Sequence, residues 1–308
     1  MNEQKQNIWI DTDLAVGKKR THKPGYCDVD DGYAVLQLLK NDQITISGIS
    51  TVFGNTSIEN AYEIAADICD KYATYEIPYF KGAEAALDPQ KVEHNEATLA
   101  LAEKLKNNRL KILAIGPATN VAIVLLKNPE LAKNIEEVVL VAGRRKPTDY
   151  FNIGSKGNRA PDLNFDLDNL AFEVMFQAGI PVTLCPFEIS SKVWITDEDL
   201  QKLAKSDSAN QWLANHSEAW LNQWLEQGAQ GFNPFDVLAS HYLIAPELIK
   251  SEMLSAKLEL HLNDQIPENP NQQFKNYLLC GDEGLYKVKY CFDVADGYHQ
   301  ALIESLTK

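Results

Sequence analysis

The sequence predicts an α/β fold with an open, mostly parallel sheet and helices on both faces. Short apolar runs rich in β-branched residues alternate with segments of helical periodicity through most of the chain. A length of 308 residues is sufficient for such a sheet. No internal repeat and no low-complexity linker interrupts the alternation. We therefore expect residues 1–308 to form a single domain.

The first two thirds of the chain supply the alternating elements. We expect strands at residues 8–10, 44–52, 110–115, 138–141 and 181–186, and helices at 32–40, 57–72, 96–106, 119–127 and 170–178. The carboxyl ends of parallel strands meet at one edge of a sheet, where α/β proteins place their ligand sites. Residues that follow these strands are therefore the first candidates for a functional site.

The last third begins with a long helical segment, residues 196–227. Asp207 is suited to cap a helix start, so the segment is expected to be two helices, the second beginning after Asp207. Strands are then expected at 257–262 and 286–292, followed by a closing helix at 297–306. Residues 263–275, which are rich in Asn, Pro and Gln, are expected to form a loop.

Charge and cysteine content exclude several classes of function. Lys and Arg number 29 and Asp and Glu number 43, a net charge of 29 − 43 = −14. A chain this acidic lacks the basic surface used for nucleic acids or anionic membranes. Residues 1–7 are polar and show no secretory signal, and five scattered cysteines without a CxxC pair indicate a reducing cytoplasm.

Carboxylates gather at the end of the first strand. Asp11-Thr12-Asp13 ends that strand, and Asp28-Val29-Asp30-Asp31 opens the first helix. Carboxylates this close repel one another, and a hard cation such as calcium or magnesium would offset the repulsion. The alternative interpretation is that Asp30 caps the helix and its neighbours are solvated.

Further motifs occur in a fixed order after this cluster. They are Gly-Ile-Ser-Thr-Val-Phe-Gly-Asn at 48–55, Leu-Ala-Ile-Gly-Pro-Ala-Thr-Asn-Val-Ala at 113–122, Val-Val-Leu-Val-Ala-Gly at 138–143, Pro-Asp-Leu-Asn at 161–164 with Asp168, and Phe-Asp at 235–236. This series resembles the inosine-uridine-type nucleoside hydrolase family over nearly the whole chain.

The resemblance implies a cytoplasmic, calcium-dependent glycosidase of purine or pyrimidine salvage that releases the base from ribonucleosides as a homodimer or homotetramer. It implies that Asp13 binds the metal and takes a proton from the attacking water. The other implied metal ligands are Asp31, Asp236 and the backbone carbonyl of Ile115. The residues implied to bind substrate are Asp30, Asn55, Asp162, Asn164 and Phe235.

The chain departs from the family pattern in three places. An insertion, residues 14–27, separates Asp13 from Asp30 and carries Lys18, Lys19, Arg20, His22 and Lys23. We expect it to fold over the mouth of the site and bring positive charge to the substrate; the alternative is a solvated loop. Phe235 stands where many members carry a His that donates a proton to the leaving base. Asp162 stands where Glu is usual, which would widen the 5′ side of the ribose pocket.

Two other functions remain open from the sequence. Arg144, Arg145 and Arg159 near Asp162, together with the basic insertion, would suit a phosphorylated or otherwise 5′-extended riboside. A non-catalytic ribose-binding protein on the same scaffold is the other alternative. His216, Trp220 and Trp224 fall where the family places side chains that contact the base, and His216 is a candidate leaving-group acid; packing of an amphipathic helix explains them equally well.

Overall fold

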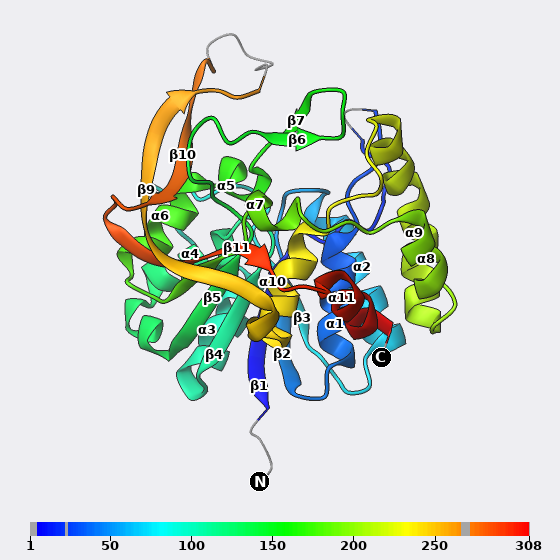
Figure 1. The fold of residues 1–308 in the computed structure, drawn as a ribbon. Coiled ribbons are helices and arrows are strands. Elements are labelled where there is room, and N and C mark those ends of the chain that lie inside the picture. The colour runs from blue at the N-terminus through cyan, green and yellow to red at the C-terminus, as the bar shows by residue number, and fades with distance from the viewer. Residues whose placement is uncertain (1–4, 22–23, 266–271, 308) are drawn as a thin grey trace.

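A twisted sheet forms the centre of the molecule (Figure 1). The computed structural model describes residues 5–21, 24–265 and 272–307, which excludes His22 and Lys23 of the insertion and residues 1–4 of the polar N-terminus. Within these residues the strand order is β10-β9-β11-β8-β5-β4-β1-β2-β3. All neighbouring strands from β3 to β11 are parallel, whereas β9 pairs antiparallel with both β11 and β10 at one edge. The predicted fold class is confirmed.

The described strands of this sheet have the following bounds: β1 (Gln6–Thr12), β2 (Ile44–Thr51), β3 (Tyr79–Lys81), β4 (Leu110–Ala114), β5 (Ile135–Leu140), β8 (Val182–Leu184), β9 (Ile249–Leu262), β10 (Phe274–Gly281) and β11 (Tyr286–Val294). A separate two-stranded ribbon consists of β6 (Phe151–Ile153) and β7 (Asn158–Ala160).

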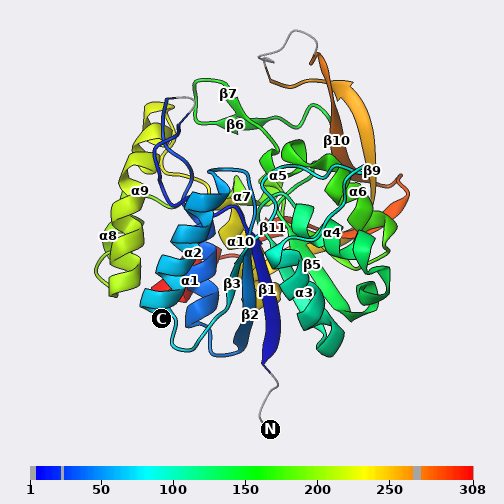
Figure 2. The same ribbon diagram turned by 180° about the vertical axis from the view of Figure 1, so that it is seen from behind.

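Helices cover both faces of the sheet, as the views from front and back show (Figures 1 and 2). Helices α1 (Asp30–Lys40), α2 (Ile58–Tyr72), α10 (Phe235–Ile244) and α11 (Tyr298–Thr307) pack on one face; α3 (Glu96–Asn107), α4 (Thr119–Lys127) and α6 (Asn169–Gln177) pack on the other. The remaining helices are α5 (Leu163–Leu167), α7 (Phe187–Ser190), α8 (Asp197–Leu203) and α9 (Ser208–Glu226), with short 3-10 turns at Pro129–Asn134 and Pro246–Leu248.

The alternation of side chains along β1 explains why one short strand supports two cores. Ile8 and Ile10 belong to the cluster under α1 and α10, whereas Trp9 points to the opposite cluster under α3 and α4. Trp9 fits there because position 48 on the neighbouring strand is glycine. A Cβ at Gly48 would lie 2.3 Å from the Trp9 ring.

Two predicted helix starts are confirmed at the level of single hydrogen bonds. Ser57 caps α2 by accepting a hydrogen bond from the amide of Asn60 at 3.3 Å. Asp207 caps α9 by accepting one from the amide of Asn210 at 2.9 Å. The segment 196–227 is therefore two helices, as predicted.

The C-terminal part of the sheet differs from prediction. The strand expected at 257–262 is the end of β9, which begins at Ile249, and β10 begins at Phe274 within the segment expected to be a loop. Turn-forming residues dominate 263–273 and conceal the start of β10, but Leu278 and Cys280 on that strand are buried against the core. Residues 266–271 of the expected loop lie outside the described part of the chain.

Burial of His241 in α10 makes stability depend on pH. Burial lowers the pKa of His241 from 6.5 to about 4, and its ring hydrogen-bonds the Tyr298 hydroxyl at 2.9 Å. Folding therefore favours the neutral imidazole. The stabilisation is complete above pH 6.5 and is lost as the pH falls from 6.5 towards 4.

We expect this loss to be visible in a comparison of the wild-type protein with His241→Gln. Between pH 7 and pH 4 the wild type should lose about 3 kcal/mol of unfolding free energy relative to the variant. Urea unfolding at both pH values measures the difference. A stability gap that is the same at both pH values would show that His241 is not held neutral.

Candidate active site

The predicted site residues converge at the carboxyl ends of β1, β2 and β4, the edge of the sheet that lies away from the N-terminus in Figure 2. Asp13 follows β1, Asn55 follows β2 and Ile115 follows β4. Two helices begin at the same edge: the amide of Asp236 in the first turn of α10 donates to the side chain of Asp30 at the start of α1. Segments far apart in the sequence thus build one site.

Three carboxylates come closest together. One oxygen from each of Asp28, Asp30 and Asp31 lies within 4.8 Å of the other two. Asp13 and Asp236 lie outside this tight group but interact with it electrostatically. Asp13 raises the pKa of Asp31, and Asp31 raises the pKa of Asp236. Asp13, Asp31, Asp30 and Asp236 are all at most 5% exposed.

Burial is the main cause of the unusual titration of these groups. It raises the pKa of Asp13, Asp31 and Asp236 well above the ordinary value, and repulsion between neighbouring carboxylates raises it further. The pKa of Asp30 rises to about 6, again mainly through burial. Buried negative charge without a positive partner lowers the free energy of unfolding of a protein.

Among the buried oxygens without a hydrogen-bond partner in the described part of the chain, four belong to aspartates at or next to this site: Asp11 Oδ2, Asp13 Oδ1, Asp28 Oδ1 and Asp31 Oδ2. Buried polar atoms are normally paired, so an unpaired set that shares one location indicates a missing partner. The donors are all oxygen atoms with negative charge, which is the ligand set of a hard divalent cation. The residues present therefore fit a metal ion.

Three of the cluster's carboxylates have one oxygen held by a hydrogen bond. The amide of Asn55 donates to Asp13 Oδ2 at 2.7 Å, and the amide of Asp236 donates to Asp30 Oδ2 at 3.0 Å. The Thr12 hydroxyl donates to Asp31 Oδ1. These contacts orient the three side chains, and the other oxygens of Asp13 and Asp31 keep no partner among the described residues.

Glycine at position 54 permits the close approach at Asp13. A Cβ on Gly54 would lie 2.0 Å from Asp13 Oδ2. Any larger residue would displace the carboxylate that the Asn55 amide holds.

The predicted sugar-binding side chains lie beside this cluster. Asn164 Nδ2 donates to the carbonyl of Ile115 at 3.2 Å and to that of Val141 at 3.3 Å. A carbonyl oxygen has a second lone pair, so the Ile115 carbonyl can still bind a cation. Asp162 Oδ2 accepts from the Gly143 amide at 2.9 Å, and burial raises the pKa of Asp162 to about 7.

The place of Asn120 in the site was not predicted, and Asp28 was predicted as part of the acidic cluster but not as a site residue. Asn120 donates to Asp11 Oδ1 at 2.8 Å and to the Thr51 carbonyl at 3.0 Å, and it accepts from the Ala83 amide at 2.9 Å. It thereby joins the ends of β1 and β2 to the segment that follows β3. The sequence carried a signal for both residues: Asn120 lies in the motif at 113–122, and Asp28 lies two positions before Asp30.

Aromatic side chains surround the predicted base-binding residue. Phe235 is partly buried and packs on Phe187 and Trp224, with ring centroids 5.9 and 6.0 Å apart. Trp220 and Trp224 are buried, which confirms the packing interpretation for both. His216 is exposed, and its Nδ1 lies 2.7 Å from the Trp212 carbonyl.

Basic residues near the site are paired with the protein's own carboxylates. Arg144 is 2% exposed and contacts Asp264 at 2.7 Å. Arg145 contacts Glu188 and Glu252, both at 2.8 Å. The arginines that suggested a phosphate site are thus largely neutralised within the fold.

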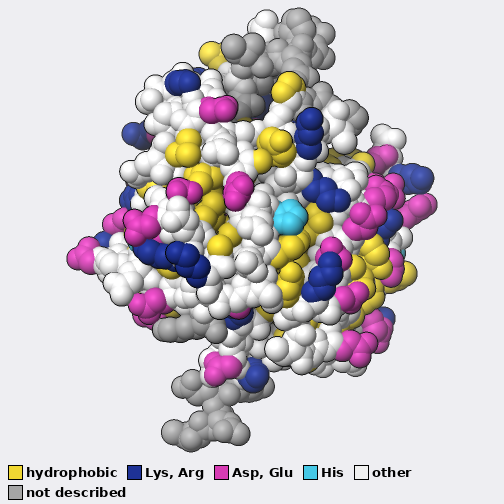
Figure 3. Space-filling view, turned by 90° about the vertical axis from the view of Figure 1, so that its right-hand side faces the viewer, with side chains coloured by type: hydrophobic (Ala, Val, Ile, Leu, Met, Phe, Trp, Pro, Cys, Tyr) yellow, Lys and Arg dark blue, Asp and Glu magenta, His cyan; other side chains and the backbone are white. Residues whose placement is uncertain are grey.

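Arg159 is also held by contacts within the fold, through an aromatic ring and a backbone carbonyl instead of a carboxylate. Arg159 lies over the Tyr150 ring and donates to the Asp264 carbonyl at 3.0 Å. On the face shown in Figure 3, acidic and basic side chains are interspersed and no extended area of one sign forms.

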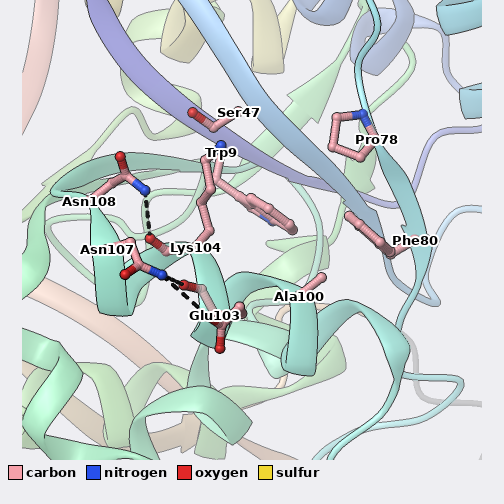
Figure 4. A pocket seen from close by; sticks show the side chains of 9 residues that line it. All are labelled: Trp9, Ser47, Pro78, Phe80, Ala100, Glu103, Lys104, Asn107 and Asn108. Atoms are coloured by element: carbon pink, nitrogen blue, oxygen red, sulfur yellow. Dashed lines mark hydrogen bonds between the residues drawn. The ribbon is translucent and has the colours of Figure 1, made fainter.

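A separate hollow of about 320 Å³ lies between the sheet and α3 (Figure 4). Trp9, Ser47, Pro78 and Phe80 line one side, and the C-terminal end of α3 lines the other. None of the predicted site residues contributes to it.

Among the described residues, no helix is both long and apolar enough to cross a bilayer.

Comparisons with known proteins agree with this geometry. The sequence model of the family "Inosine-uridine preferring nucleoside hydrolase" matches residues 8–274. The chain is 26% identical over 277 residues to the probable uridine nucleosidase 1 of Oryza sativa subsp. japonica, covering 80% of this chain and 79% of the rice protein. It is 24% identical over 269 residues to the pyrimidine-specific ribonucleoside hydrolase RihA of Shewanella woodyi, covering 77% and 81%.

A solved structure shares the fold. The plant nucleoside hydrolase PpNRh1 superimposes with a TM-score of 0.77 at 18% identity, covering 98% of this chain and 99% of that chain.

We expect a divalent cation to stabilise the protein through the unpaired carboxylates. At a free concentration one hundred times its Kd, the ion should add about 2.7 kcal/mol to the unfolding free energy. Thermal unfolding of chelator-treated protein, with and without calcium or magnesium, measures the shift. Asp31→Asn should abolish most of it, whereas Asp42→Asn, on the surface, should not. An unfolding temperature that does not respond to either ion would contradict a cation site.

Proposed function

The chain belongs to the inosine-uridine preferring nucleoside hydrolase family, and we propose that its buried aspartate cluster is the active site, which holds a calcium ion. Membership makes the protein an N-glycosyl hydrolase that acts on ribonucleosides. The observation that carries the proposed site is the set of unpaired carboxylate oxygens at the carboxyl ends of parallel strands. Calcium prefers an all-oxygen, flexible set of ligands of this kind.

Asp13, Asp31, Asp236 and the carbonyl of Ile115 are the proposed metal ligands. When bound, the ion would lower the pKa of a water and fix the ribose hydroxyls. Asp13 is the proposed base: its Oδ2 is held by the Asn55 amide, and its unpaired Oδ1 can take the proton of the attacking water. The water oxygen then bonds to the ribose carbon as the bond to the base nitrogen breaks.

The sugar is proposed to lie against Asp30, Asn55, Asp162 and Asn164. Glycosidic bonds break through a state with positive charge on the sugar, which nearby carboxylates stabilise. Asp30 has one oxygen fixed by the Asp236 amide and can accept a ribose hydroxyl with the other. Asn164 is held between two carbonyls, so its amide group is positioned before substrate binds.

A 5′-phosphorylated substrate finds less support in the structure than an ordinary nucleoside. A phosphate would need free positive charge beside Asp162, and Arg144 and Arg145 are already paired with carboxylates. A non-catalytic role would leave the unpaired oxygens of Asp13 and Asp31 unexplained. Hydrolysis of nucleosides without a 5′-phosphate accounts for the paired arginines and for the unpaired carboxylate oxygens.

Three other properties stay proposals. The resemblance is the basis for a homodimer or homotetramer. The cytoplasmic location is also supported by the scattered cysteines, and the single domain over residues 1–308 by the absence of a linker in the sequence.

We expect Asp13→Asn to fold normally and to lose most of its activity. The amide has nearly the same shape but cannot take a proton, and positioned proton transfer contributes about 10²–10⁴-fold to a rate. Ribose release from inosine and uridine measures the loss, with circular dichroism as a check of folding and Asp42→Asn as the control. If Asp13→Asn turned over at the wild-type rate, another group would have to activate the water.

We also expect the leaving base to depart without help from residue 235, because Phe235 cannot donate a proton. A nitrophenyl riboside, whose leaving group needs no proton, should then be cleaved faster than a purine riboside at the same pH. The ratio of kcat/KM for the two substrates is the measurement. Equal values would show that departure of the base does not limit the rate.

A further inference from the structure

The insertion, residues 14–27, is anchored to the body of the protein. Leu14, Ala15 and Val16 are at most 1% exposed, and Cys27 is 2% exposed. In Figures 1 and 2 its dark-blue trace lies beside α9. Its stem is therefore part of the core and differs from a solvated loop.

Helix α9 fixes the insertion through the backbone. Gln223 Oε1 accepts from the Tyr26 amide at 2.7 Å, and its Nε2 donates to the Tyr26 carbonyl at 3.3 Å. Gly17 has φ +65°, and a Cβ there would lie 2.1 Å from the His216 carbonyl oxygen. The chain can pass this close to α9 because position 17 is glycine.

The base of the insertion closes at Asp28. The Gly17 amide donates to the Asp28 carbonyl at 2.8 Å, and the Cys27 amide donates to the Lys18 carbonyl at 2.8 Å. Lys18 reaches away from the site, to Asn60 Oδ1 of α2 at 3.0 Å. The two backbone hydrogen bonds thus join the ends of the insertion and hold the backbone at Asp28.

The Asp28 side chain is brought into the aspartate cluster by this anchoring. Its Oδ1 is buried and has no hydrogen-bond partner among the described residues, and the same is true of Oδ2 of the fully buried Asp31 and Oδ1 of the fully buried Asp13. Oxygens that bind one calcium ion at 2.3–2.6 Å lie at most about 5 Å apart. The ligand atoms of Asp28, Asp30 and Asp31 satisfy this limit, because all lie within 4.8 Å of one another.

We propose that Asp28 is a further direct ligand of the metal ion, delivered by the insertion. The proposal rests on the metal site under the proposed function and adds a ligand to the set of Asp13, Asp31, Asp236 and Ile115. The purpose of the insertion is then to hold a carboxylate at the ion. Its basic side chains need not reach the substrate.

Arg20 offers the competing explanation. Its positive charge acts on Asp28, so Asp28 could serve only as the partner of Arg20 in a structural ion pair. The two explanations differ in what removal of the side chain does. Loss of a structural partner lowers the stability of the metal-free protein, whereas loss of a ligand weakens binding of the ion and admits a water in its place.

The test compares the wild type with Asp28→Ala, Asp31→Ala and the surface control Asp42→Ala. Calorimetry gives the Kd for calcium, and the luminescence lifetime of bound terbium in H₂O and D₂O counts the waters on the ion. Changes to outer partners of metal ligands weaken binding about 10–100-fold. We therefore expect Asp28→Ala to weaken calcium binding at least about tenfold and to add a bound water, with Asp42→Ala unchanged.

Three results would overturn the proposal in distinguishable ways. If the wild type binds no calcium or terbium, the metal site itself fails and Asp28 as a ligand fails with it. If Asp31→Ala loses binding while Asp28→Ala keeps the wild-type Kd and water count, the metal site stands and Asp28 is not a ligand. If Asp28→Ala only lowers the unfolding temperature of metal-free protein, its role is the pair with Arg20.

A variant that retains the negative charge covers the case in which Asp28→Ala does not fold. Asp28→Glu keeps the charge but moves the carboxylate by one methylene. A direct ligand predicts a changed Kd or water count for Asp28→Glu. An unchanged Kd and water count would show that Asp28 acts only through its charge.

Discussion

Mutual repulsion among buried carboxylates is the constraint on which the rest of this structure depends. Asp13, Asp30, Asp31 and Asp236 come from β1, α1 and α10, and each is almost fully buried. Backbone amides and the Thr12 hydroxyl hold one oxygen of Asp13, Asp30 and Asp31. These partners compensate only part of the negative charge, and a cation at the cluster would compensate the remainder.

The fold supplies the rigidity that this cluster needs. Alternation along β1 places Ile8 and Ile10 in one core and Trp9 in the other, so the strand that ends in Asp13 is fixed from both faces. Asn120 joins the carboxyl ends of β1 and β2. The contact of the Asp236 amide with Asp30 ties the start of α10 to the start of α1, two helices that also pack along their length.

Most of the fold could be predicted because its signals are local. Asp207 and Ser57 cap helices where a short polar residue precedes a helical pattern. The start of β10 could not be predicted from the sequence, because a strand that begins in a turn-rich segment is recognised only by the core that it packs against. In the site, the end of the first strand pointed to Asp13, whereas the role of Ile115 came from the resemblance to the family; both roles stay predictions. The ion pairs of Arg144 and Arg145 depend on Asp264 and Glu252, more than one hundred residues away, and no local pattern reveals them.

The central claim is that a divalent cation at the aspartate cluster is required for hydrolysis. The most direct measurement is ribose release from inosine and uridine by protein freed of metal with a chelator, before and after calcium is added back. The account predicts that activity is lost with the metal and restored by calcium in the wild type, and that calcium does not restore it in Asp31→Asn. Full activity of the metal-free protein would contradict the claim.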